Sequence, residues 1–248
     1  MPASVHVQLV PSLAGVAEGT VLTIEGDEAH HAVAVRRLRA AEPVLLTDGA
    51  GRSALCLVRA TGKRRLDVEV TSLTETEAPA PAFTVVQAIP KGDRGELAVE
   101  VLTEIGVSTI VPWAASRSVA VWKGERAERS LAKWRATARE AAKQARRWWF
   151  PEVAPMASTA EVAARASAAP VAVVLHEQAG TALSAVDLPE RGEIVVVVGP
   201  EGGLSPEEVA AFEAAGAITV RLGAEVLRTS TAGLAAVSAL LARTARWA

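Results

Sequence analysis

The sequence contains one cysteine, Cys56, among its 248 residues, and it contains no tyrosine. A single cysteine excludes an intrachain disulfide and a metal site built from a cysteine cluster. No apolar run reaches the roughly 18 residues of a transmembrane helix, and residues 1–12 lack the basic start and apolar stretch of a secretory signal. We therefore expect a protein of the reducing cytoplasm without a membrane span.

An excess of positive charge is also lacking, because 26 lysines and arginines stand against 28 aspartates and glutamates, a net charge of −2. This balance excludes a globally basic nucleic-acid-binding protein but allows a local basic face. The four histidines (His6, His30, His31 and His176) lack the spacing of metal ligands, so we expect no metal site. Half of the residues are hydrophobic, enough for a large folded core, and the length predicts one or two domains.

Two patterns divide the chain. In residues 1–74, short β-forming runs separated by turn formers predict a small antiparallel sheet or barrel. Residues 75–82 contain two prolines among small and acidic residues, which predicts an exposed linker. In residues 83–248, apolar runs alternate with helical patterns, which predicts a parallel α/β sheet. The expected strands are residues 5–10, 21–24, 44–47, 54–60, 66–73, 83–89, 109–112, 171–175, 194–198 and 218–222. The expected helices are residues 96–105, 126–148 and 160–168, one capped by Ser205, and one from about residue 230.

The positive charge is concentrated in one segment. Residues 113–150 hold ten cations and three anions, a net charge of +7, which leaves −9 for the rest of the chain. Five tryptophans lie in this segment (Trp113, Trp122, Trp134, Trp148 and Trp149). Cations interleaved with aromatic rings are typical of phosphate contact and base stacking. The alternative is a solvated helix face whose tryptophans point into the core.

Two loops at strand ends indicate a ligand pocket. The apolar run at 194–198 ends in the glycine-rich turn at 199–203, and the run at 218–222 ends in the segment 223–229. Ligands of parallel α/β sheets bind at the carboxyl ends of strands, where glycine lets the backbone approach them. Neither the dinucleotide fingerprint nor the P-loop pattern is present, which makes a nicotinamide oxidoreductase a poor interpretation. Leu175, His176 and Glu177, at the end of a third apolar run, predict a further wall, and Thr229 or Ser230 is expected to cap the last helix.

These residues resemble a known family. The letters GPEGG at 199–203 and LGAEVLRT at 222–229 resemble the cofactor site of SPOUT-class RNA methyltransferases. Further similarity to the RsmE family of 16S ribosomal RNA uridine N3-methyltransferases lies in HHAVAVRRLR at 30–39, KGDR at 91–94, EIGV at 104–107, RS at 117–118 and EAAKQ at 140–144 with Arg147 and Pro151. The motifs occur in order over nearly the whole chain. At Ser230 the sequence departs from the family, which usually has glutamate there.

The resemblance implies an α/β protein with an N-terminal PUA-like β-barrel and a C-terminal SPOUT domain that carries a trefoil knot. It implies a homodimer that binds S-adenosyl-L-methionine and methylates N3 of a uridine in 16S ribosomal RNA or the small ribosomal subunit. The implied cofactor-binding residues are Leu175, His176, Gly199, Glu201, Gly202, Gly203, Leu222, Gly223, Val226, Leu227 and Thr229. The implied RNA-binding residues are Arg36, Arg37, Arg39, Lys91, Arg94, Arg117, Gln144 and Arg147.

Arg228 and Glu201 are the catalytic candidates. N3 of uridine carries a proton, so its methylation needs a base or a cation that stabilises the uridine anion. We expect Arg228 to be that cation, or else to form an ion pair with Glu201 or Glu225 that holds the loop. Glu201 is expected to act as the base or as an anchor for Arg228.

Two other functions stay open at this point. One is a SPOUT methyltransferase that modifies the ribose 2′-hydroxyl of ribosomal or transfer RNA. The other is a non-catalytic RNA-binding assembly factor, to which Ser230 gives some weight.

Overall fold

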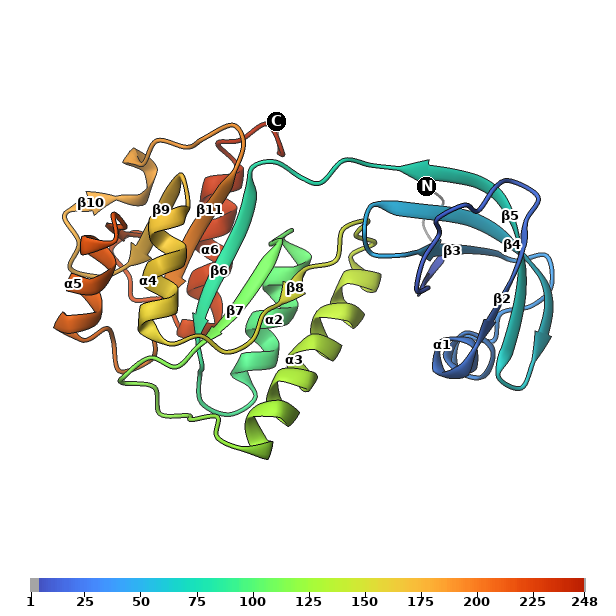
Figure 1. Cartoon of the computed structure of the whole chain (residues 1–248), viewed down its shortest axis with the longest axis horizontal. Coiled ribbons are helices and arrows are strands. Elements are labelled where there is room, and N and C mark those ends of the chain that lie inside the picture. Colours follow the sequence, from blue (N-terminus) through green and yellow to red (C-terminus); the bar gives the residue numbers. More distant parts are fainter. Residues whose placement is uncertain (1–4, 248) are drawn as a thin grey trace. The chain divides into compact units, whose positions relative to one another are not determined.

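The computed structural model describes residues 5–247, which form two compact units. Unit 1 contains the chain up to Ala78 together with Lys143–Phe150, and unit 2 contains Pro79–Ala142 and Pro151 onward (Figure 1). Residues 1–4, part of the stretch expected to lack a signal sequence, lie outside the described residues, as does residue 248. No helix within residues 5–247 is long and apolar enough to cross a membrane.

Unit 1 is built on a curled five-stranded sheet in the order β1-β3-β4-β5-β2. The strands are β1 His6–Leu9, β2 Val21–Glu25, β3 Pro43–Thr47, β4 Arg52–Gly62 and β5 Arg65–Glu75. Alternate residues of the long hairpin, such as Ala54 and Cys56 in β4 and Val68 and Val70 in β5, enter one apolar core. The expected antiparallel arrangement is correct for three strand pairs and wrong for β1, which pairs with β3 in parallel.

A helical turn that the sequence analysis missed lies between β2 and β3. Helix α1 (Gly26–His30) continues directly into a π-helix (His31–Val35). Ala29 and Ala32 are fully buried and hold this element against the core of unit 1. Each piece has only five residues, too few for an apolar periodicity to be visible in the sequence.

Unit 2 contains a seven-stranded sheet in the order β10-β12-β9-β11-β6-β7-β8, and every strand pair is parallel, as expected. The strands are β6 Ala82–Ala88, β7 Thr109–Trp113, β8 Glu152–Val153, β9 Val171–Leu175, β10 Thr181–Ala182, β11 Glu193–Val198 and β12 Ile218–Arg221. Val196 and Val198 of β11 pack in one core cluster, and Val195 and Val197 pack in the other. The unbroken apolar run thus reflects a strand that is covered on both faces.

Helices cover both faces of this sheet. They are α2 Arg94–Glu104, α3 Glu125–Gln144, α4 Thr159–Ala168, α5 Pro206–Ala214 and α6 Thr229–Leu241, with a 3-10 turn at Leu183–Ala185. Side chains of α2, α3 and α6 join the core on one face, and those of α4 and α5 join the core on the other (Figure 1). The strand-helix alternation of the sequence therefore corresponds to three layers.

The tryptophans of the basic segment divide between core and surface. Trp113 packs edge-on against Phe212, and Trp122 packs edge-on against Trp134. All three tryptophans are buried, so they belong to the core of unit 2 and are not available to stack on bases. Trp148 and Trp149 are half-buried and belong to unit 1.

Helix α3 ends at Gln144, four residues before the expected end at residue 148. Arg146 has a φ of +53°, in the left-handed region that a helix does not contain. The segment Lys143–Phe150 then lies against the turn between β3 and β4. The N–H of Gly51 donates to the carbonyl of Trp148 (2.9 Å), and the N–H of Phe150 donates to the carbonyl of Gly49 (2.8 Å). This pairing explains why a segment of the expected C-terminal domain packs in unit 1.

Candidate functional site

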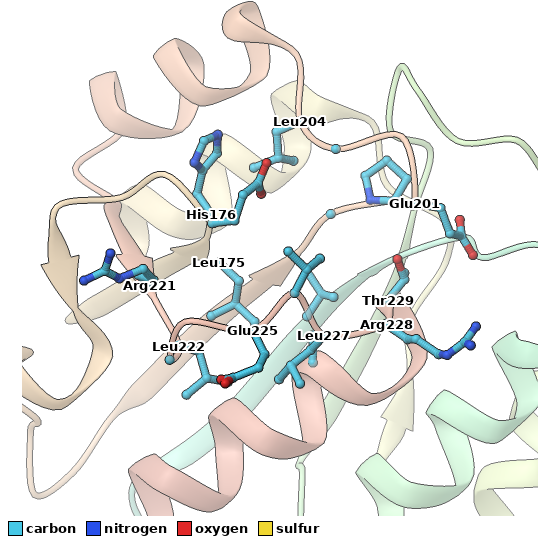
Figure 2. A pocket seen from close by; sticks show the side chains of 18 of the residues that line it. Leu175, His176, Glu201, Leu204, Arg221, Leu222, Glu225, Leu227, Arg228 and Thr229 are labelled. Atoms are coloured by element: carbon cyan, nitrogen blue, oxygen red, sulfur yellow. The ribbon is translucent and has the colours of Figure 1, made fainter.

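A cavity of about 490 Å³ lies in unit 2 at the carboxyl ends of β12, β9 and β11, which are neighbours in the sheet (Figure 2). Three loops form its walls, because each strand is followed by a segment that turns over the end of the sheet. They are the segments 176–177, 199–204 and 222–228. The glycine-rich turn and the second loop therefore meet in space, as the strand-end argument predicts.

Every residue expected to bind the cofactor lines this cavity, from Leu175 and His176 through the glycine turn to Leu227 and Thr229. Arg228 and Arg94 line it as well. Glu177, expected as part of the third wall, lines the cavity too, and so do residues that were not singled out, namely Val198, Pro200, Leu204, Arg221, Ala224, Glu225 and Ala232. Most of them are sequence neighbours of expected residues, so their signal was the loop itself rather than their residue type.

The glycine turn is shaped by close contacts at two of its glycines. A Cβ at Gly202 would lie 3.0 Å from the carbonyl oxygen of Arg117, and a Cβ at Gly199 would lie 3.1 Å from the side chain of Leu204. The turn closes with a hydrogen bond from the N–H of Gly203 to the carbonyl of Pro200 (2.9 Å). A side chain at either tight position would displace the turn that forms the cavity wall.

The second loop offers its main chain to the cavity. Across residues 5–247, the backbone groups of residues 223–227 have no hydrogen-bond partner. Gly223 has a φ of +77°, which suits glycine, and Val226 is 81% exposed beside the half-buried Leu222. Free N–H and C=O groups next to apolar side chains suit a planar heterocycle with polar edges.

Charged side chains surround the rim. Arg228 and Glu201 lie on one side of the cavity, whereas Arg221 and His176 lie on the opposite side (Figure 2). The Glu201 carboxylate accepts a hydrogen bond from the backbone N–H of Lys91 (3.2 Å). Arg228 is exposed, and within the described residues it forms no ion pair with Glu201, Glu225 or any other carboxylate. The alternative in which Arg228 holds the loop through an ion pair is therefore wrong for this structure.

The residue at the N-cap of α6 differs from the expected Thr229 or Ser230. Neither Thr229 nor Ser230 caps the helix, because Arg228 occupies the N-cap position and its carbonyl accepts hydrogen bonds from Thr231 and Ala232. Thr229 and Ser230 are buried instead. The side-chain amide of Gln87, at the end of β6, donates to the carbonyl of Thr229 (3.2 Å). Gln87 thus ties the sheet to the residue that follows Arg228.

Glu208, three residues after the expected cap Ser205, supports the site from behind the glycine turn. It is buried in the first turn of α5, and its carboxylate accepts hydrogen bonds from the backbone N–H groups of Ser116 (2.7 Å) and Ser205 (2.9 Å). The guanidinium of Arg117 donates to the carbonyl of Leu204 (3.0 Å). These bonds fasten the segment around Ser116 to the outer side of the glycine turn.

The expected RNA-binding residues fall in two groups. In unit 2, Lys91 and Arg94 lie beside the cavity, and Arg117 lies behind the glycine turn. In unit 1, Arg36, Arg37 and Arg39 are exposed after the π-helix, and Gln144 and Arg147 lie at the end of α3 and beyond it. No group of three histidine, cysteine or carboxylate side chains that is able to hold a metal ion occurs in the part of the chain that the structure describes.

Comparison with known proteins follows this division. Residues 24–71 match the family of RNA methyltransferase PUA domains, and residues 76–241 match the family of RNA methyltransferase domains. The chain is 42% identical over 233 residues to the ribosomal RNA small subunit methyltransferase E of Mycobacterium bovis, covering 92% of this chain and 89% of that protein. It is 30% identical to the corresponding protein of Bacillus subtilis, with 90% of each chain covered.

A solved structure shares the fold over nearly its whole length. It is a ribosomal RNA small subunit methyltransferase E from Neisseria gonorrhoeae bound to S-adenosylmethionine, with a TM-score of 0.87 and 27% identity, and it covers 97% of this chain and 98% of that one. Together with the family matches and the 42% identity, this similarity assigns the chain. It belongs to the ribosomal RNA small subunit methyltransferase E (RsmE) family.

Proposed function

We propose that this protein transfers a methyl group from S-adenosyl-L-methionine to N3 of a uridine in 16S ribosomal RNA. The observation that carries the proposal is the meeting of the glycine turn and the second loop around one cavity at the ends of β9, β11 and β12. The relatives support the substrate class, because they are named as small-subunit ribosomal RNA methyltransferases, and one was solved with this cofactor.

The cavity suits S-adenosylmethionine in chemistry and in form. The unpartnered backbone of residues 223–227 supplies donors and acceptors for the adenine edge, and Leu175, Leu222 and Val226 supply apolar contacts for its faces. Glu177, Glu201 and Glu225 provide carboxylates for a ligand that carries an ammonium and a sulfonium. A Cβ at Gly199 or Gly202 would disturb the cradle. When bound, the cofactor supplies an electrophilic methyl group for an in-line displacement.

The protein's own residues then have to orient the uridine and manage the proton on N3. Holding two reactants in line contributes roughly 7–11 kcal/mol at best. Arg228, which pairs with no carboxylate among residues 5–247, is placed to stabilise negative charge on the uracil ring or a neighbouring phosphate. Glu201 is our candidate for the proton acceptor at N3, because its carboxylate lies on the same side of the cavity as Arg228 (Figure 2).

RNA contact is proposed for Arg36, Arg37 and Arg39 in unit 1, and for Lys91, Arg94 and Arg117 in unit 2. The first three are exposed cations that follow one another closely on a turn, an arrangement that suits successive phosphates. Gln144 and Arg147 complete the set. A homodimer, a trefoil knot in unit 2 and a cytoplasmic location are further parts of the proposal that rest on family membership.

The test is methyl transfer from radiolabelled S-adenosylmethionine to purified 16S ribosomal RNA and to assembled small subunits, followed by identification of the modified nucleoside by mass spectrometry. We expect N3-methyluridine. A ribose-methylated nucleoside would replace the proposal by 2′-O-methylation. Failure to bind the cofactor at millimolar concentration in calorimetry would favour a non-catalytic assembly factor.

A further inference from the structure

A second cavity lies within unit 1, away from the residues of the proposed methyl-transfer site. Its volume is about 150 Å³, and it lies on the face of the sheet opposite to the core of unit 1. The lining residues are Val5, Leu45, Ser53, Leu55, Ser72, Thr74, Arg146 and Trp148. A cavity of about 150 Å³ accepts a single six-membered ring such as benzene.

The register of the sheet creates the floor of this cavity. Leu45 of β3 pairs with Leu55 of β4, which pairs with Ser72 of β5, and one step along the same face Ser53 pairs with Thr74. Residues two apart on a strand share a face, so these side chains form one continuous platform. The core residues Ala54 and Cys56 alternate with them and point to the other face. The platform therefore belongs to the outer face of the sheet and is not a packing gap in the core.

The polar groups on this platform have no partners. Ser53 is only 2% exposed, yet its hydroxyl forms no hydrogen bond with any described residue, and the same holds for the hydroxyls of Ser72 and Thr74. Thr74 is exposed, and the hydroxyl oxygens of Ser53 and Ser72 are not among the fully buried unpartnered atoms of residues 5–247, so a ligand in the cavity can reach all three. The three hydroxyls offer donors and acceptors to the edge of that ligand.

The remaining wall comes from the segment Lys143–Phe150, which supplies Arg146 and Trp148. The segment is fixed in place, because Trp148 and Phe150 pair with the backbone of Gly51 and Gly49. A Cβ at Gly51 would meet the ring of Trp149 at 2.6 Å, so glycine is needed for this close approach. Lys143 is buried and paired with Glu28 (3.0 Å), so the segment brings one cation to the cavity, the side chain of Arg146, together with the half-buried ring of Trp148. An aromatic ring next to a cation suits a stacked base with its phosphates.

We propose that this cavity binds one unpaired pyrimidine base of the RNA substrate, with the ring against Trp148 and its polar edge on the hydroxyls of Ser53, Ser72 and Thr74. The flanking phosphates lie near Arg146. The volume matches a single six-membered ring more closely than the two fused rings of a purine, and the arginine that lines the cavity favours RNA over an uncharged ligand. This inference rests on the proposed action on RNA, and it adds a base-reading subsite to unit 1.

The experiment measures binding of fluorescently labelled hexauridylate and hexa-adenylate to the full-length protein by anisotropy. In Trp148→Ala, hexauridylate affinity should fall about 5- to 150-fold, the loss expected for one base stack. Trp148→Phe should retain most of the affinity, because phenylalanine keeps an aromatic face. The matched control is Trp247→Ala, which removes a tryptophan that is 52% exposed and lies outside the cavity, and it should leave affinity unchanged.

A second variant tests the cavity without removing Trp148, in case Trp148→Ala misfolds. Ser72→Phe fills the cavity from a half-exposed position and leaves Trp148 and its backbone bonds in place, so it should lower hexauridylate affinity as strongly as Trp148→Ala. Salt dependence separates stacking from charge, because Trp148→Ala should leave the slope of log affinity against log salt unchanged, whereas Arg146→Ala should reduce it by about one. Wild-type affinity in Ser72→Phe would overturn the proposal, as would an equal loss of hexa-adenylate affinity.

Methyl transfer measured on the same preparations keeps the two proposals apart. If the wild-type protein methylates ribosomal RNA while Trp148→Ala and Ser72→Phe bind hexauridylate normally, the base subsite is wrong and the enzymatic function stands. If both variants lose hexauridylate binding and the wild-type protein methylates no RNA, the subsite stands and the enzymatic function is wrong.

Discussion

The two cavities proposed to bind ligands are built from different parts of the chain. In unit 2 the walls are supplied by loops that each follow one strand of a parallel sheet. In unit 1 the walls are side chains that come from three strands and from a segment much later in the sequence. The first kind of cavity depends on glycine and on loop shape. The second depends on individual side chains. Added atoms at a glycine should therefore harm the first cavity most, and removal of a side chain should harm the second most.

The largest effect is expected where the cavity of unit 2 uses a side chain for chemistry. Arg228→Ala should lower kcat about 100- to 1,000-fold, the usual loss when one group that stabilises developing charge is removed. Fold and cofactor affinity should persist, because the Arg228 side chain makes no capping bond to α6. Arg221→Ala is the matched control, since Arg221 lies on the opposite side of the same cavity (Figure 2). Steady-state kinetics with ribosomal RNA provides the measurement, and unchanged turnover in Arg228→Ala would remove this residue from the mechanism.

A smaller effect is expected from altering the main-chain wall. Gly202→Val should weaken S-adenosylmethionine binding about 5- to 150-fold, because the added atoms collide with the carbonyl of Arg117 and overpacking costs about 1–3 kcal/mol. Gly180→Val is the control, since a Cβ there meets nothing within 4 Å and the residue does not line the cavity. Titration calorimetry compares the two variants. Equal affinities would mean that the glycine turn does not shape the cofactor site.

The support behind that wall can be tested through two similar helix starts. Both α4 and α5 begin with a capping box, formed by Ser158 with Glu161 and by Ser205 with Glu208. Glu208 is buried and also accepts a hydrogen bond from Ser116, whereas Glu161 is exposed. Glu208→Ala should therefore lower the free energy of unfolding by about 1–3 kcal/mol, because it leaves the buried backbone N–H of Ser205 and the partly buried N–H bond of Ser116 without their acceptor. Glu161→Ala should have the smaller effect, and urea denaturation of both variants makes the comparison.

The exposed capping box also has a pH signature. Hydrogen bonds from the backbone and then the hydroxyl of Ser158 hold the pKa of Glu161 below its usual value of 4.5. The stabilisation from this carboxylate is present above that value and is lost as the pH falls through the lower folded-state pKa. The difference between wild type and Glu161→Ala should therefore vanish in acid. A difference that persists there would argue against the hydrogen-bonded carboxylate as its source.

The contrast between the cavities also explains what the sequence could and could not predict. Strand β9 was predicted at its observed bounds, and Ser205 was predicted as the cap of α5, because apolar runs and capping boxes are local signals. The cavity of unit 2 followed from the same signals, since the ends of parallel strands meet at one edge. By contrast, the early end of α3 depends on Arg146 adopting a positive φ and on pairing with residues 49 and 51. That pairing is long-range, and no helical periodicity reveals it.

Individual side-chain roles were predictable only in part. The hydrogen bond between Glu208 and Ser116 joins residues 92 positions apart, and the bond from Gln87 to Thr229 joins residues 142 positions apart. Trp113 and Trp148 looked alike in the sequence, yet the first lies in the core and the second lines a surface cavity. Composition places both in a basic aromatic segment. Only the packing inside each unit distinguishes a structural tryptophan from a candidate stacking platform.

The smallest effect is expected on the rate at which a thiol reagent modifies Cys56, a rate that reports whether the two units open together. Cys56 is fully buried in the core of unit 1, and burial raises the pKa of its thiol to about 12. The folded state thus keeps a proton that the unfolded state releases above its ordinary value of about 9, so unfolding becomes easier as the pH rises through that value. At pH 8 a thiol reagent should modify Cys56 only when unit 1 opens.

Saturating S-adenosylmethionine should leave the rate of Cys56 modification unchanged, because every residue that lines the proposed cofactor cavity belongs to unit 2. A ligand stabilises only those states that retain its site, so opening of unit 1 alone is not opposed by it. Gly202→Val, which should bind the cofactor weakly, serves as the control for direct effects of the added compound. Slower modification of the wild-type protein with cofactor, but not of this variant, would mean that unit 1 opens only together with unit 2. The segment Lys143–Phe150, which continues from α3 into unit 1, would then be the structural link that joins them.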